Sequence, residues 1–150
     1  MRIDNPIGLQ AALTGSFSGS FAGDGSNLTG VVTPTAAQTL TNKRIDPRVG
    51  TTTSSSSLTI DSDSYDIYCI TALASAMTIN SPSGTPVQGQ KLIIRIKDNA
   101  TARTLTWNGI FRAVGAELPT TTTISKYIYV GCIYNSTDTK WDVVAAAEEA

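Results

Sequence analysis

The sequence predicts an all-β fold in which an extended N-terminal arm, residues 1–57, precedes an antiparallel β-sandwich of jelly-roll type, residues 58–150. The first observation is a change in composition near residue 57, from Gly, Ser, Thr, Ala and Pro to short segments rich in Ile, Val, Tyr and Trp. The second is the close, regular spacing of those segments, which is typical of sandwiches and barrels. The third is that neither the 33–38 segment nor the alanine-rich tail carries a useful amphipathic helical stripe.

In the arm, apolar residues recur at every fourth position, with glycines between and beyond them. On an extended strand these side chains share one face and the intervening serines share the other. A lone glycine-rich ribbon is not stable in water, so the apolar face is expected to dock on another copy or another protein. The open alternative is a flexible Gly/Ser linker. The anchoring and oligomerisation candidates are Leu9, Leu13, Phe17, Phe21 and Leu28.

Between the arm and the sandwich, residues 54–57 are four serines that offer nothing to bury, and a hinge is expected there. Beyond the hinge, alternating or continuous apolar runs predict eight strands. These cover residues 58–60, 65–71, 76–80, 91–97, 103–107, 110–114, 126–134 and 140–145.

Two of these segments carry especially clear signals. In 91–97, Leu92, Ile94 and Ile96 share one face, while Arg95 and the two lysines share the other, so this strand is expected to meet water on one side. Between 103–107 and 110–114, the pair Asn108-Gly109 is the favoured centre of a two-residue turn, because both residues tolerate positive φ. A β-hairpin is therefore predicted there.

Composition excludes several function classes. The chain has 150 residues, a net charge of −1 and no apolar run long enough to span a bilayer, so one soluble domain at most is expected, with no membrane partner. The scattered Lys and Arg offer no footprint for nucleic acid. The start Met1–Asp4 lacks the features of a secretory signal, which favours synthesis in the cytosol. Cys69 and Cys132 are then expected to be buried free thiols.

The absence of histidine removes the usual nucleophile–base and His-metal arrangements, so neither an enzyme nor a cofactor is expected. Carboxylates remain. Asp61, Asp63 and Asp66 could hold calcium, although an acidic, solvated strand entrance is the commoner use of such a cluster. A glycosidase pair would have to be drawn from scattered acids, namely Asp61, Asp66, Glu117, Asp138 and Asp142.

Aromatic residues within the predicted strands could stack on a sugar. The candidates are Trp107, Trp141 and Tyr129. The alternative is a place in the core with the polar tip hydrogen-bonded at its margin, which is the commoner role of aromatics in alternating strands.

Several short stretches carry a family resemblance. Gly-Asp-Gly-Ser-Asn-Leu-Thr-Gly-Val at 23–31 and Thr-Leu-Thr-Asn-Lys at 39–43, followed by Ile45, resemble motifs of bacteriophage tail and head fibre proteins. The run 89–107, with Tyr134-Asn135 and Lys-Trp-Asp at 140–142, resembles the β-rich end module of phage virion proteins. The order of these parts belongs to the resemblance.

The resemblance implies a non-enzymatic virion component, assembled in the host cytoplasm, usually a homotrimer, with an N-terminal anchor on a capsid or tail protein and an outward C-terminal domain. Because the chain lacks a long repetitive shaft, its length suits a short head fibre, a capsid decoration protein or an adaptor. The alternative is a carbohydrate-binding receptor-recognition module of a tail fibre, with a host surface glycan as partner. Glycines alternating with Leu and Phe would let three arms approach one axis.

Overall fold

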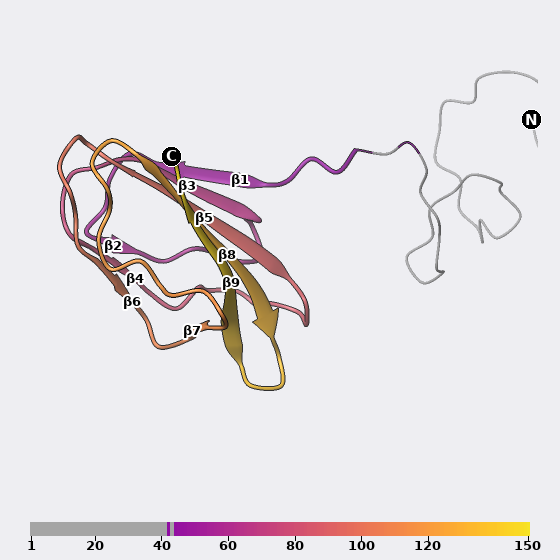
Figure 1. Ribbon diagram of the computed structural model, residues 1–150. Helices are drawn as coiled ribbons and strands as arrows, with labels where there is room; N and C mark the ends of the chain where they lie inside the picture. Colours follow the sequence, from indigo (N-terminus) through magenta and orange to yellow (C-terminus); the bar gives the residue numbers. More distant parts are fainter. Residues whose placement is uncertain (1–41, 43) are drawn as a thin grey trace, which may run out of the picture. The chain divides into compact units, whose positions relative to one another are not determined.

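A computed structural model describes residue 42 and residues 44–150, and the fold of this part is all-β (Figure 1). The chain divides into two units, Met1–Lys43 and Arg44–Ala150, and the strands of the described residues belong to the second. The five anchoring candidates of the arm lie outside the described residues.

Nine strands form two sheets within the described residues. The six-stranded sheet has the order β1-β3-β5-β8-β9-β7, and the three-stranded sheet has the order β2-β4-β6. The strands are β1 Val49–Thr52, β2 Ser57–Leu58, β3 Ile67–Leu73, β4 Met77–Ile79, β5 Lys91–Asp98, β6 Leu105–Trp107, β7 Phe111–Ala113, β8 Tyr127–Asn135 and β9 Lys140–Glu148.

From β1 to β6 the chain winds as a coil that alternates between the two sheets. Strands β1, β3 and β5 pair in parallel in the large sheet, and β2, β4 and β6 pair in parallel in the small one. Outside the strands, an isolated parallel bridge between Asp61 and Ser83 joins two successive turns of the coil. Strand β8 then runs antiparallel to β5 and β9, and β7 joins the far edge parallel to β9.

All eight predicted strand segments are present, but the antiparallel jelly-roll arrangement is wrong. The only antiparallel strand pairs in the described part are β5–β8 and β8–β9. Alternation of apolar residues specifies which face is buried, not the direction of the neighbour. From β1 to β6 the direction is set by the connections, which cross to the other sheet and return, so that each strand arrives parallel to the previous strand of its own sheet.

The β unit begins before the boundary expected at residue 57. Strand β1, which sequence patterning missed because its run Val-Gly-Thr-Thr contains a single large apolar residue, is the edge of the large sheet. The expected hinge at 54–57 is an ordered crossing between sheets: Ser54 Oγ accepts a hydrogen bond from Ala74 N at 2.9 Å, and Ser56 O accepts one from Thr78 N at 3.0 Å. The polar groups of this crossing form hydrogen bonds with the next turn of the coil. These bonds order the crossing without the burial of apolar side chains.

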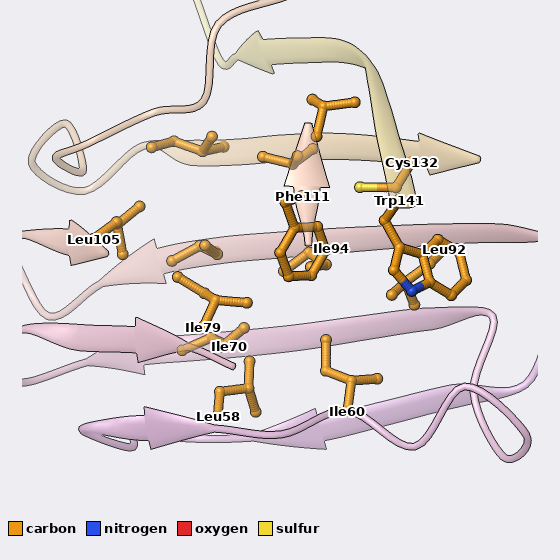
Figure 2. Close-up of a cluster of buried hydrophobic side chains, with 14 of the residues drawn as sticks. Leu58, Ile60, Ile70, Ile79, Leu92, Ile94, Leu105, Phe111, Cys132 and Trp141 are labelled. Carbon is orange, nitrogen blue, oxygen red and sulfur yellow. The ribbon is translucent and has the colours of Figure 1, made fainter. Parts of the chain in front are cut away.

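Side chains from both sheets build one buried apolar core (Figure 2). Leu58 and Ile79 are register partners in the small sheet, and Ile70 and Ile96 are partners in the large one. As predicted, Leu92, Ile94 and Ile96 are all fully buried. Stacking like residues on successive turns therefore builds one continuous apolar cluster.

Asn108-Gly109 forms a turn but not a hairpin. Asn108 O accepts a hydrogen bond from Phe111 N at 3.0 Å, and Asn108 Oδ1 accepts one from Ile110 N at 3.0 Å. The flanking strands do not pair with each other, since β6 pairs with β4 and β7 pairs with β9. Neither residue adopts a positive φ, so the turn sends the chain from one sheet to the other.

Candidate functional site

The three aromatic candidates have different fates. Trp141 is 1% exposed and packs against Tyr134 with ring centroids 5.1 Å apart, so it is a core residue, the alternative role considered for these aromatics. Trp107 is partly buried, its indole N–H donates to Pro119 O at 2.7 Å, and its ring meets Phe111 edge-on. Tyr129, at 42% exposure, lies at the surface.

Tyr129 belongs to the outer sheet face, which we define as the side of the six-stranded sheet turned away from the core. Two register rows of residues cross it from β1 to β9. The first row is Val49, Ile67, Ile93, Gly131 and Ala145, and the second is Thr51, Cys69, Arg95, Tyr129 and Ala147. The first row is entirely apolar.

Cationic side chains flank this apolar row on β5. The Arg95 guanidinium carbon lies 5.4 Å from the centroid of the Tyr127 ring, and the Lys97 ammonium lies 4.5 Å from it. Tyr127 and Tyr129 are neighbours with centroids 6.4 Å apart. The outer sheet face thus combines aliphatic, aromatic and cationic groups, and lacks the enclosure that a small ligand requires.

A shallow polar depression lies elsewhere, among the turns that follow β2 and β4. It is lined by Arg48, Ser62, Asp63, Thr85, Val87, Gln88, Gly89 and Gln90. Its polar groups are engaged within the protein: Asp63 accepts from the amide and hydroxyl of Thr85, and the Gln90 amide donates to Ser62 O at 2.7 Å. Tyr129 is not among the lining residues, so the aromatic surface and the polar depression do not form a common site.

The three aspartates considered for calcium separate into structural roles. Asp61 accepts from Ser64 Oγ at 2.6 Å, Asp63 caps the Thr85 turn, and Asp66 accepts from the Arg48 guanidinium at 2.7 and 3.1 Å. The side-chain and backbone hydrogen bonds from Arg48 lower the pKa of Asp66 to about 2. Within the described range, no group of three or more Cys, Asp or Glu residues could hold a metal ion.

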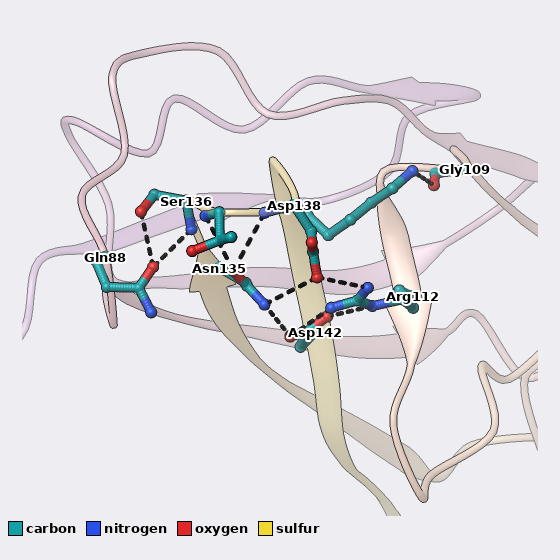
Figure 3. A network of polar contacts seen from close by, with 9 residues as sticks. Gln88, Gly109, Arg112, Asn135, Ser136, Asp138 and Asp142 are labelled. Carbon is teal, nitrogen blue, oxygen red and sulfur yellow. Dashed lines mark hydrogen bonds and ion pairs between the residues drawn. The ribbon is translucent and has the colours of Figure 1, made fainter.

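Two candidate acids do come together, at the β8–β9 turn (Figure 3). Arg112 on β7 donates to Asp142 Oδ1 at 2.7 Å and Oδ2 at 3.0 Å, and to Asp138 Oδ2 at 2.9 Å. Asn135 Nδ2 donates to both carboxylates. The hydrogen bond from Arg112 lowers the pKa of Asp142, whereas a glycosidase acid needs a raised pKa. The cluster is a clamp that joins three strands.

A buried carboxylate that sequence reasoning missed lies at the end of β5. Asp98 accepts from Thr122 Oγ1 at 2.8 Å, Ser125 N at 2.9 Å and Ala100 N at 3.0 Å. Burial alone would raise the pKa of Asp98, but these hydrogen bonds and the Arg103 charge lower it overall. The signal in the sequence was an aspartate at an inward position of an alternating strand.

Both cysteines are free and buried, as predicted. Burial raises the pKa of Cys132 to about 12, which keeps it as an unreactive thiol at neutral pH. In the part of the chain that the structure describes, no helix is long and apolar enough to cross a membrane. Comparison with protein-family models, with curated proteins and with solved structures finds no match to this chain.

Proposed function

We propose that this chain is a structural virion protein, a short head fibre, capsid decoration protein or adaptor, that its N-terminal segment anchors to a capsid or tail protein. The observation that carries the proposal is the division of the chain at Lys43/Arg44. It separates the segment that contains the Leu/Phe stripe from a β unit that has its own core.

The chemistry of the β unit supports a structural role. Its carboxylate clusters are tied up by arginines, hydroxyls and backbone amides, which fixes turns and edge strands. Pairing with arginine lowers the pKa of Asp66 and Asp142, so both remain ionised at neutral pH as structural partners. A coil that joins two sheets at every turn suits a rigid, outward module.

In this proposal the copies associate as a homotrimer through Leu9, Leu13, Phe17, Phe21 and Leu28. An apolar side chain that becomes fully buried contributes about 1.5–3 kcal/mol, and the contribution recurs in every copy. The glycines between the phenylalanines provide room for close approach around an axis.

The test is attachment to purified virions, followed by cosedimentation. The double variant F17S/F21S is expected to lose attachment. The control S18A/S20A, which alters the opposite face of the same segment, is expected to keep it. Attachment of F17S/F21S at the wild-type level would refute the anchoring role.

Glycan recognition is the second candidate, and the exposed Tyr129 beside Arg95 favours it. Against it, Tyr129 lies on an open sheet face, where a sugar would be covered on one side only. A glycan array with the wild-type chain and Tyr129→Ala decides between the two. Binding that is lost in the variant would establish the recognition module.

A further inference from the structure

We propose that the outer sheet face is the surface on which a second copy of this chain packs. The first argument is exposure. Val49 is 53% exposed, Ile93 38% and Ile133 37%, and with Tyr129 they lie on one face of β1, β5 and β8. A contiguous apolar area of this kind on a sheet is typical of a protein interface.

The second argument is the shape of the surface, which depends on how far the side chains project from the sheet. Tall side chains, Ile93 and Tyr129, project from β5 and β8, whereas the β9 positions in their two register rows are Ala145 and Ala147. The register partner of Ala145 on β8 is a glycine, Gly131, so the surface is low on that side. The face therefore has a raised half and a low half, and in a closed ring the raised half of one copy fits the low half of the next.

The third argument is charge. Lys91, Arg95 and Lys97 all stand on β5, and none of them forms an ion pair with another described residue. Glu149 follows β9 beside Tyr127 and accepts a hydrogen bond from Tyr127 N through one carboxylate oxygen. The raised half is thus cationic and the low half ends in an anion, so the same fit that matches shape also matches charge.

The fourth argument is chain connectivity, and it rests on the proposed function. Residues 44–48 are all exposed and directly precede Val49, the first member of the apolar row. If the N-terminal segments associate, the copies of the outer sheet face are held at a high effective concentration.

The experiment uses the full chain and measures self-association by sedimentation velocity from about 1 to 100 µM, a range that covers interfaces of moderate strength. Ile93→Glu is expected to raise the dissociation constant about tenfold or more. Ile124→Glu is the matched control, because Ile124 is 56% exposed but lies outside the strands. It is expected to associate as the wild type does.

A charge exchange separates a lost contact from a damaged fold. Lys97→Glu and Glu149→Lys are each expected to weaken association, and the double variant K97E/E149K is expected to restore it. A wild-type monomer throughout the range, or equal association of Ile93→Glu and Ile124→Glu, would overturn the inference. If Tyr129→Ala associates as the wild type does but no longer binds glycan, the inference is overturned and the face is a glycan-binding surface.

Failure of the proposed function gives a different result. If the wild-type chain does not attach to virions but Ile93→Glu still weakens self-association, the outer sheet face remains a self-association surface and the virion role falls. If attachment holds and Ile93→Glu changes nothing, the virion role remains and this inference falls.

Discussion

Arg112 on β7 and Asp142 on β9 form a two-point ion pair, with Nε–Oδ1 at 2.7 Å and Nη2–Oδ2 at 3.0 Å. The residues are register partners in the parallel β7–β9 pair, so the side chains reinforce the strand pairing directly. Since β7 is a three-residue edge strand, it depends on this clamp more than a central strand would.

Replacing Arg112 by Met should therefore loosen β7. We expect a lower melting temperature and faster hydrogen exchange at the Val114 amide, which donates to Val143 O at 3.0 Å. Asp138→Asn is the graded control and should have a smaller effect, because Asp138 contributes one contact and is half exposed. Exchange at Val114 that is equal in wild type and R112M would show that backbone pairing alone holds the edge.

Gly50 should tolerate no side chain. A Cβ atom there would lie 2.5 Å from the Tyr68 ring and 3.0 Å from the Tyr65 ring, so Gly50→Ala must displace an aromatic pair. We expect a loss of about 1–3 kcal/mol in the free energy of unfolding, measured by urea denaturation.

Gly131→Ala is the matched control for Gly50, since it is also a strand glycine. The added Cβ would meet the Ala145 Cβ at an ordinary 3.6 Å. Its effect should stay within about 0.5 kcal/mol. Equal destabilisation by the two variants would mean that strand propensity, not the aromatic contact, decides the cost.

Asp66 should make the fold sensitive to acid. Its pKa is about 2 in the folded state, through hydrogen bonds and charge from Arg48, against an ordinary value of 3.8. A depressed folded-state pKa contributes stability above the ordinary value, and this contribution is lost as the pH falls from about 4 through about 2. Denaturation curves at pH 7, 4, 3 and 2 should therefore show a steeper loss for the wild type than for Asp66→Asn.

The denaturation curves at low pH also report on a second carboxylate. Asp98 also has a lowered pKa, so Asp66→Asn should retain part of the acid sensitivity. A variant with the full wild-type slope would show that the Arg48–Asp66 pair does not couple to folding.

Cys132 should be unreactive in the native protein. Burial raises its pKa to about 12, and the side chain is 2% exposed. With iodoacetamide at pH 8, intact-mass measurement should find Cys132 unmodified in buffer and fully modified in guanidinium chloride. Native labelling at the rate of an exposed thiol would reveal opening of β8 from the sheet.

The sequence allowed the strands to be located but not the way they pair. Apolar alternation in 91–97 identified β5 and its buried face, because that pattern is local. Parallel pairing of β3 with β5 depends on the crossing through residues 74–90, which carries no comparable local signal.

The positions of the aromatic candidates could not be predicted for a related reason. Trp141 and Tyr129 both lie in alternating strands, but Trp141 is a core residue and Tyr129 lies on the outer face. A run that carries apolar residues on both faces does not show which face the rest of the chain will cover. The exposed apolar row could not be seen in any one strand, since it takes one residue from each of five strands.

The strand order has a consequence for the timing of folding during synthesis. Strands β3 to β6 each pair with a strand that the ribosome has already made, so each new turn of the coil has a template as it emerges. Strand β7 is different, because its partner β9 is the last strand to be synthesised. The early turns can therefore form while the chain is still attached, but the far edge of the large sheet waits for the C-terminus.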